Sequence, residues 1–357
     1  MYFHGIKVFA LPGSDILAEK VCFHLNQIVP ESLKPDGGIK LIKPQIELFD
    51  NENIMAKIDN VRGHFVVVIH TQCPPVHDSL FSLFALLDAI QNSNAADLLL
   101  VFPYMPYARS DRKDQPRISV MSRVLAEILN NVLNVHRIIL LDPHDSHVKH
   151  YFKPSADEIS SIYLYIDFIK NLIANHFPED TDKLLIAFSD GGAAKRFSKL
   201  KEHLPELLHD YIDKYRKDNQ GTLQLQKEIL CQGKICLMID DEICSGGTAI
   251  KDALSLKENG AEKIIMLAPH APLAKINKPI NEVITNLENS PIDHLIITDT
   301  IPTTDKINSQ NKFHVLSVAG LLAQAIHQTV MNESVTKLHD PDNVNLYRPS
   351  QYPILGF

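Results

Sequence analysis

The sequence predicts an α/β protein with two domains, each a mainly parallel β-sheet flanked by helices. Short apolar runs recur along the 357 residues, and each run leads through a polar or glycine-containing loop into a helical pattern. Strands that alternate with helices form parallel sheets, and near-continuous apolar strands suit sheets covered on both faces. The runs outnumber the strands of one ordinary sheet, and the length fits about two domains, so we infer two.

The expected strands are residues 6–10, 65–70, 98–102, 138–141, 184–188, 235–239, 264–268 and 295–298. Charged and small residues cluster directly after these runs. Open α/β sheets bind their ligands at the carboxyl ends of the strands. This distribution therefore predicts an active site assembled from the loops that follow the strands.

The chain offers one candidate linker, residues 153–157. We therefore expect an N-terminal domain at residues 1–157 and a C-terminal domain at residues 158–312. A strand and a helix within 313–330 are expected to return to the N-terminal domain. Residues 331–357, rich in Asp, Asn and Pro, are expected to form an irregular tail.

Composition restricts the classes of partner. The net charge of −8 provides no broad basic surface for nucleic acid, and no apolar run reaches the length of a membrane span. Five cysteines without a Cys-x-x-Cys pair fit a reduced protein better than a disulfide framework. The first ten residues read as a strand and not as a signal peptide. We expect a cytoplasmic protein with neither nucleic acid nor membrane as partner.

The most informative segment is an apolar strand that ends in two acids and then turns into a helical pattern: Asp240-Asp241-Glu242-Ile243-Cys244-Ser245-Gly246-Gly247-Thr248. Gly246 and Gly247 let the backbone approach an anion and reach positive φ. The amides of residues 245–248 would point at a phosphate from a helix N-terminus. Asp240 and Asp241 could hold ribose hydroxyls or Mg²⁺. A solvated cap is the alternative, but the strand and the Ser-Gly-Gly-Thr favour a site for a phosphorylated sugar.

Further segments carry a family resemblance, and they occur in the family's order: Phe49-Asp50-Asn51-Glu52, Asn60-Val61-Arg62-Gly63, Tyr107 to Asp114 with Arg117, Asp142-Pro143-His144, Tyr151-Phe152, Ser189-Asp190-Gly191-Gly192 and Asp299-Thr300-Ile301-Pro302. Together with residues 240–248, which we call the acidic loop, these segments make the chain resemble one family. This is the ribose-phosphate pyrophosphokinase (phosphoribosyl pyrophosphate synthetase) family, and the resemblance runs from about Phe9 to Gln328.

The resemblance implies two domains of the phosphoribosyltransferase type and a hexamer built from dimers. It also implies Mg²⁺-ATP and ribose 5-phosphate as substrates. In the implied reaction the anomeric hydroxyl attacks the β-phosphorus of ATP, and AMP leaves. Such an enzyme positions both substrates and neutralises charge on the phosphoryl oxygens, with Mg²⁺ as its cofactor.

The resemblance places ATP on two loops. Arg109 would contact its phosphates, with Ser110 and Arg112 beside it, because a guanidinium matches phosphate bidentately. A solvated run of charges is the alternative. Phe49 would stack on adenine, in a loop that reaches a neighbouring subunit's active site in the family. Asp50 with Glu52 would read the base or the ribose, and a polar loop without this role is the alternative.

The implied ribose 5-phosphate site comprises Asp190, Asp240, Asp241, Cys244, Ser245, Gly246, Gly247 and Thr248. His144 and Asp190 would bind the Mg²⁺ of ATP, directly or through water, and Asp240 and Asp241 are further metal candidates. A loop histidine that only hydrogen-bonds to backbone is the alternative for His144. His147 completes a His-x-x-His spacing, but no third ligand accompanies it and zinc is not expected.

Two interpretations compete for one segment. Lys214 and Arg216 resemble the family's catalytic loop and would stabilise the transition state. Apolar residues at helical spacing from Leu204 to Tyr215 instead predict an amphipathic helix, which would leave Lys214 on an exposed face.

The chain also departs from the family at the sites themselves. Cys244 replaces an Asp, Ser110 a Gln and Asn51 a Gly, and a Pro is missing before Asp190. A thiol cannot supply the charge of a carboxylate. We therefore expect a divergent but active synthetase. A non-catalytic regulatory homologue and a phosphoribosyltransferase are the alternatives.

Overall fold

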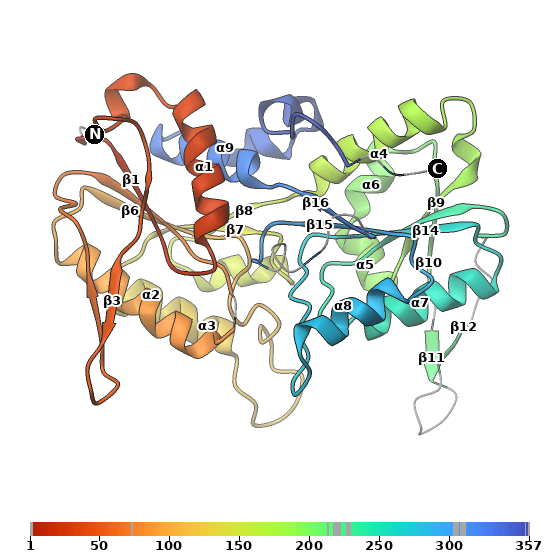
Figure 1. Ribbon diagram of the computed structural model, residues 1–357, viewed down its shortest axis with the longest axis horizontal. Coiled ribbons are helices and arrows are strands. Elements are labelled where there is room, and N and C mark those ends of the chain that lie inside the picture. The colour runs from red at the N-terminus through yellow and green to blue at the C-terminus, as the bar shows by residue number, and fades with distance from the viewer. Residues whose placement is uncertain are drawn as a thin grey trace. The chain divides into compact units, whose positions relative to one another are not determined.

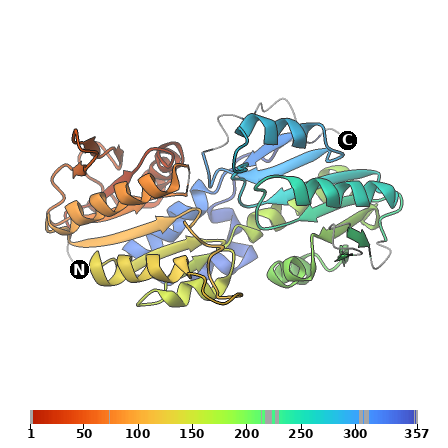
Figure 2. The same cartoon turned by 90° about the horizontal axis from the view of Figure 1, so that it is seen from below.

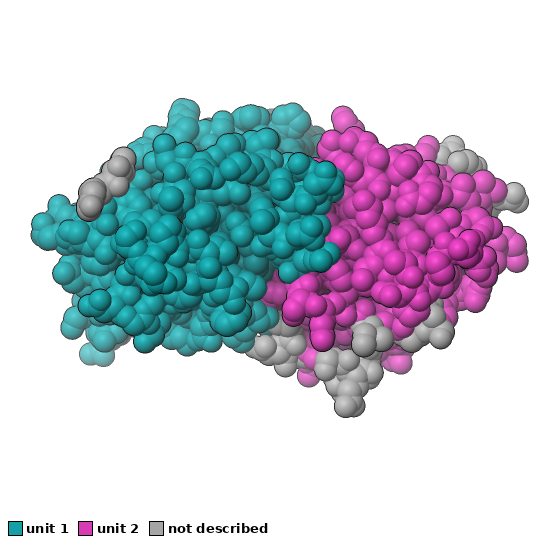
Figure 3. Space-filling view, turned by 90° about the horizontal axis from the view of Figure 1, so that it is seen from above, with its two compact units in different colours: residues 1–161, 300–302, 318–348 teal, residues 162–299, 303–317, 349–357 magenta. Residues whose placement is uncertain are grey.

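The computed structural model describes residues 3–72, 74–212, 214–216, 223–225, 230–302, 307, 312–353 and 355. The chain divides into two compact units, coloured separately in Figure 3. The first unit comprises residues 1–161, 300–302 and 318–348, and the second comprises 162–299, 303–317 and 349–357.

The first unit contains a parallel sheet in the order β2-β1-β5-β6-β7-β8. Its strands are β1 (Ile6–Ala10), β2 (Leu41–Ile42), β5 (Phe65–Ile69), β6 (Asp97–Phe102), β7 (Arg137–Leu141) and β8 (Asp157–Ile159). Its helices are α1 (Asp15–Ile28), α2 (Val76–Gln91), α3 (Met121–Glu127) and α9 (Ala319–Val330). Helices α2 and α3 cover one face of the sheet, while α1 and α9 pack together on the other (Figure 1). A hairpin of β3 (Gln45–Leu48) and β4 (Ile54–Lys57) projects from this unit. Two 3-10 helices lie at Glu31–Leu33 and Ser146–Tyr151, and a π-helical segment at Ile128–Val132 follows α3.

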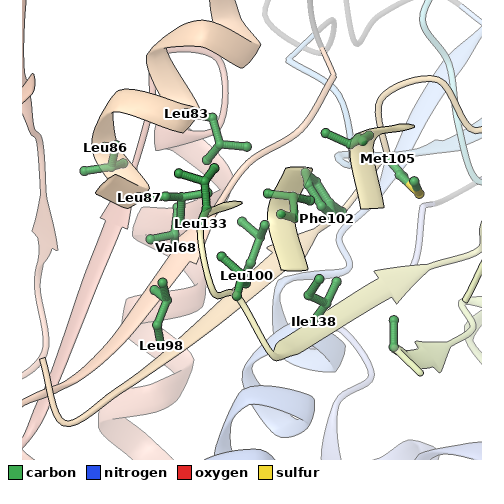
Figure 4. Packing of buried hydrophobic residues seen from close by; sticks show 14 of the residues in the cluster. Val68, Leu83, Leu86, Leu87, Leu98, Leu100, Phe102, Met105, Leu133 and Ile138 are labelled. Atoms are coloured by element: carbon green, nitrogen blue, oxygen red, sulfur yellow. The ribbon is translucent and has the colours of Figure 1, made fainter. Parts of the chain in front are cut away.

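Periodicity explains the core of this unit. On α2, buried leucines recur at helical spacing and form one apolar face, which includes Leu83 and Leu87. On β6, Leu98, Leu100 and Phe102 alternate along the strand and meet that face (Figure 4). All five residues of β5 are buried, so the sheet is covered on both faces as its apolar strands predict.

The second unit repeats this architecture with the parallel order β10-β9-β13-β14-β15-β16. Its strands are β9 (Leu184–Phe188), β10 (Leu208–Tyr211), β13 (Ile235–Ile239), β14 (Lys263–Ala268), β15 (His294–Thr298) and β16 (Phe313–Leu316). Its helices are α4 (Ile162–His176), α5 (Gly191–Arg196), α6 (Ser198–His203), α7 (Gly247–Glu258) and α8 (Ile280–Glu288), with a single turn at Thr181–Lys183. Helices α7 and α8, teal and blue in Figure 2, cover one face of this sheet. The short strands β11 (Lys214–Arg216) and β12 (Leu223–Leu225) pair antiparallel.

The expected fold class is confirmed, and every strand expected from the apolar runs is present. The prediction of an amphipathic helix from Leu204 to Tyr215 is wrong, because β10 and β11 occupy this segment. Leu208 and Tyr211 are exposed whereas Leu204 is buried, so the apolar residues do not share one face. Pairing of β10 with β9 overrides the local periodicity.

The C-terminal part divides differently from the expectation. β16 extends the sheet of the second unit, whereas α9 belongs to the first. Two 3-10 helices, Val335–His339 and Pro341–Leu346, occupy much of the segment expected to be irregular. The first unit continues to residue 161, past the boundary expected at 157. Across the described ranges, no helix combines the length and the apolar character that crossing a membrane requires.

Candidate active site

The acidic loop connects β13 to α7 in the second unit. β13 ends at Ile239, directly before the two acids, and α7 begins at Gly247. Gly246 is the N-cap of α7 with a φ of 73°, in the left-handed region that glycine tolerates best. A Cβ at this position would lie 3.0 Å from Cδ2 of Leu287. Glycine is therefore required here by both backbone conformation and space, and Gly247 with Thr248 is exposed at the helix N-terminus.

The two acids sit where water is scarce. Asp241 is 8% exposed, and its backbone N–H donates to Oδ1 of Asp240 at 2.9 Å. Burial raises the pKa of Asp240 well above its ordinary value, and the neighbouring carboxyl of Asp241 adds to the rise. A hydrogen bond from Ser189 acts in the opposite direction. Negative charge on both acids is therefore unfavourable unless a cation or a set of hydroxyl donors stabilises it.

Arg196 forms an ion pair with Asp241, a contact that the sequence patterns did not reveal. Its Nη1 lies 2.7 Å from Oδ2 of Asp241. Arg196 ends α5, the short helix that follows β9, and β9 pairs directly with β13. The available sequence signal is a basic residue four positions after Gly192, the last residue of the Asp-Gly-Gly segment.

Asp190 begins the same helix. Its Oδ1 accepts a hydrogen bond of 2.8 Å from the backbone N–H of Ala193, so the carboxylate caps α5. Ser189 N–H donates to the carbonyl of Ile239 at 3.2 Å, which ties the end of β9 to the end of β13. Asp190 and Asp240 therefore follow neighbouring parallel strands, as a site at the carboxyl edge of a sheet requires.

Cys244 lies within the acidic loop and contacts another acid. Its Sγ donates to Oε1 of Glu242 at 3.2 Å. Both side chains are partly exposed. The thiol is thus held beside a carboxylate rather than buried among apolar groups.

The segment 107–122 of the first unit is fixed by its own hydrogen bonds. Tyr107 has a φ of 59°, and its carbonyl accepts from the hydroxyl of Ser122 at 2.6 Å. The hydroxyl of Ser110 accepts from Met121 N–H at 3.2 Å and lies 3.4 Å from the carbonyl of Ser119. Ser110 therefore joins the loop to the start of α3.

The cations of this segment face solvent. Arg109 and Arg112 are exposed, whereas Asp111 between them is 8% exposed. The hydroxyl of Tyr151 donates to the carbonyl of Asp111, which fixes the backbone between the two arginines. Two guanidinium groups on an anchored loop suit the binding of phosphate oxygens.

Phe49, Asp50 and Glu52 lie at the tip of the β3–β4 hairpin. The N–H of Phe49 donates to the carbonyl of Asn53 at 2.9 Å, and the N–H of Glu52 donates to the carbonyl of Phe49 at 2.8 Å. Phe49 is 53% exposed, and Asp50 and Glu52 are exposed as well. An aromatic ring at an exposed tip is free to stack on a planar group.

His144 follows β7 in a loop whose neighbours are fixed. Asp142 accepts hydrogen bonds from Ser160 Oγ at 2.6 Å and from Ser161 N–H at 2.9 Å. Asp145 accepts from the N–H of His147 and contacts its Nδ1 at 2.7 Å, and these bonds hold the pKa of Asp145 below its usual value. His147 is thus engaged by a carboxylate.

Comparison with known proteins decides the family. A family model described as the N-terminal domain of ribose phosphate pyrophosphokinase matches residues 6–132, and one described as the phosphoribosyl synthetase-associated domain matches residues 222–340. Ribose-phosphate pyrophosphokinase of Rhizobium meliloti strain 1021 is 30% identical over 337 residues, covering 94% of this chain and 100% of that protein. The chain belongs to the ribose-phosphate pyrophosphokinase family. The enzyme of that name from Agrobacterium fabrum strain C58 is equally similar, at 30% identity over the same length and coverage.

The structure of phosphoribosylpyrophosphate synthetase from Mycobacterium smegmatis has the same fold. It superposes with a TM-score of 0.78 at 24% identity, covering 92% of this chain and 99% of that one. The resemblance stated from the motifs is therefore confirmed at the level of family and fold, and the family is one of diphosphotransferases.

The residues expected to bind metal fit Mg²⁺ by their chemistry. Asp190, Asp240 and Asp241 are carboxylates at one edge of a sheet, and Mg²⁺ commonly uses one or two carboxylates together with substrate phosphates and water. Within the described ranges, no group of three or more His, Cys, Asp or Glu side chains is arranged to hold a metal by itself.

The resemblance places the family's catalytic loop at Lys214 and Arg216. Their backbone forms β11, but their side chains lie outside the part of the structure that is described. The catalytic role of both residues therefore stays a prediction.

Proposed function

We propose that this chain transfers the pyrophosphoryl group of ATP to ribose 5-phosphate, giving phosphoribosyl pyrophosphate and AMP. The observation that carries the proposal is the acidic loop: two acids end β13, and a left-handed Gly246 opens the N-terminus of α7. Membership of the ribose-phosphate pyrophosphokinase family supports the same reaction.

Ribose 5-phosphate would bind along this loop. The N–H groups of residues 245–248 and the positive end of the α7 dipole would hold its phosphate. Asp240 and Asp241 would accept hydrogen bonds from the ribose hydroxyls, and Asp190 would line the neighbouring strand end. Cys244 replaces the family's Asp but stays next to the carboxylate of Glu242.

ATP would bind to the loops of the first unit. Arg109 and Arg112 would contact its phosphates, Phe49 would stack on adenine, and Asp50 with Glu52 would accept from the base or the ribose. His144 would assist in binding the Mg²⁺ of ATP. The hydroxyl of Ser110 supports the loop through Met121 and Ser119, so its contribution to ATP binding would come through loop shape.

In the reaction, a bond forms between the anomeric oxygen and the β-phosphorus, and the bond from that phosphorus to the oxygen of AMP breaks. The hydroxyl proton is released. When bound, Mg²⁺ would neutralise charge on the phosphoryl oxygens. Lys214 and Arg216 would stabilise the charge that develops in the transition state, while the acidic loop orients the attacking hydroxyl.

We further propose self-association into a dimer-based hexamer, as the family resemblance implies. The exposed hairpin tip with Phe49 suits a residue that serves a neighbouring subunit. An activity that falls with dilution would follow, because the adenine site would be completed only in the assembly.

The test is AMP production by the purified chain with Mg²⁺-ATP, with and without ribose 5-phosphate. Asp241→Ala and Lys214→Ala are expected to abolish AMP formation that depends on ribose 5-phosphate, while the exposed Glu179→Ala serves as the matched acidic control. AMP release independent of ribose 5-phosphate would refute the proposal. Binding of either substrate without turnover would favour a regulatory homologue, and nucleotide formation from a free base with phosphoribosyl pyrophosphate would favour a phosphoribosyltransferase.

A further inference from the structure

We infer that Arg196 is a positioning residue for sugar recognition: it orients the Asp241 carboxylate that receives the ribose hydroxyls. The inference rests on the proposed function and extends it to a residue outside the acidic loop. It follows from the ion pair between Arg196 and Asp241 and from the surroundings of that pair.

The contact is short and asymmetrically buried. Nη1 of Arg196 lies 2.7 Å from Oδ2 of Asp241, with 33% of the arginine side chain exposed but only 12% of the aspartate side chain. The carboxylate is therefore largely removed from water, while the guanidinium keeps part of its hydration. Such a carboxylate needs a cation or hydrogen-bond donors, because an unpaired buried charge is strongly unfavourable.

The neighbouring acid makes the requirement stronger. Asp240 precedes Asp241 directly, and its Oδ1 accepts from the backbone N–H of Asp241. Two adjacent carboxyl groups repel each other when both are charged. Arg196 offsets this repulsion on the Asp241 side. Its planar guanidinium also fixes the direction of the carboxylate, whereas the rounder ammonium of lysine would fix only the distance.

The fold explains why Arg196 occupies this place. Helix α5 spans only Gly191–Arg196, with Asp190 capping its first turn and Arg196 ending its last. A cation is favoured at a helix C-terminus, so Arg196 is stabilised where it stands. Because β9 pairs with β13, one short helix after β9 brings the guanidinium to the acid that follows β13.

Two other cations lie close to Arg196 in the sequence. Lys199 of α6 pairs with Glu202 at 2.7 Å, and Lys195 is exposed, as Arg196 is. Lys195 lies on the same helix, carries the same charge and is adjacent in sequence. It therefore provides the matched control for a charge-removing substitution.

The experiment compares Arg196→Met, Arg196→Lys and Lys195→Met with the wild type. Binding of ribose 5-phosphate is measured by calorimetry without ATP, and KM is measured for both substrates. We expect Arg196→Met to weaken ribose 5-phosphate binding and to raise its KM at least tenfold, with the KM for ATP within twofold. Arg196→Lys should recover part of the loss, and Lys195→Met should match the wild type.

Several outcomes would overturn the inference. These are unchanged ribose 5-phosphate binding in Arg196→Met, an equal rise of both KM values, or an equal loss in Lys195→Met. If Arg196→Met lowers the thermal midpoint of unfolding, Arg196→Lys, which keeps the charge, is compared with the wild type in its place. Absence of ribose 5-phosphate binding by the wild type overturns both this inference and the proposed function. Binding that depends on Arg196 without any AMP production overturns the proposed reaction alone.

Discussion

Protonation of His70 should make the first unit sensitive to acid. His70 follows β5 and is 1% exposed, and its ring packs edge-on against Phe102 with centroids 6.1 Å apart. Within the described structure, neither ring nitrogen has a hydrogen-bond partner. Burial lowers the pKa of His70 from 6.5 to about 4, because the charged imidazolium would lose its hydration there.

The sign of the effect follows from this depressed pKa. Between pH 4 and 6.5 the unfolded chain binds a proton at His70 that the folded chain does not bind. The contribution of the group to stability is therefore complete above pH 6.5 and is lost as the pH falls towards 4. The two pKa values correspond to about 3 kcal/mol at the acid limit and about 2 kcal/mol at pH 5.

The assay is urea unfolding of the wild type and His70→Leu at pH 8 and pH 5. We expect the unfolding free energy of the wild type to fall by about 2 kcal/mol more than that of the variant over this interval. His150→Gln, at an exposed histidine of the same unit, should keep the wild-type dependence. An identical pH dependence in wild type and His70→Leu would refute the argument, because titration of His70 would then contribute nothing.

Three other substitutions test the packing. Gly246→Ala should destabilise the folded protein by roughly 1–2 kcal/mol, because φ is positive at this position and a leucine atom lies 3.0 Å from the added Cβ. Gly247→Ala should not destabilise it. Thermal melting of both variants tests this, and equal losses of stability would contradict the argument. Gly320→Ala would place a Cβ 2.6 Å from the carbonyl oxygen of Tyr347, so we expect the unfolding free energy measured in urea to fall by about 1–3 kcal/mol. An unchanged unfolding free energy would show that the C-terminal segment moves aside at little cost. Leu100→Ala, in the fully buried core of the first unit, should cost about 2–5 kcal/mol in the same assay, and a loss below about 1 kcal/mol would mean that the core refills the space.

Much of the fold could be predicted because burial of the central strands leaves a strong signal. β5 and β13 are apolar throughout and are buried at every position, so they read as strands without any tertiary information. β10 could not be recognised, because its exposed Leu208 and Tyr211 imitate the spacing of a helix. What identifies β10 as a strand is pairing with β9, a contact that local sequence does not encode.

The candidate site likewise contains features that local sequence predicts and features that depend on strand pairing. The turn at Gly246 was predictable, because a strand, small residues and a helix specify a left-handed glycine locally. The pairing of Arg196 with Asp241 was not, because it joins the ends of two neighbouring strands through a helix. Sequence motifs report which groups can bind a ligand, and the topology determines which groups hold them in place.

The resemblance places Cys244 where the family has an Asp, and the loop partly offsets the consequence of this difference. A thiol in place of a carboxylate removes one negative charge from the acidic loop. Glu242 Oε1 nevertheless lies 3.2 Å from Cys244 Sγ, so a carboxylate remains adjacent to the altered position. Placing Asp at 244 would bring two carboxylates together and add repulsion. The charge at residue 242 and the lack of charge at residue 244 are therefore coupled, and a change at either position must be interpreted together with the other.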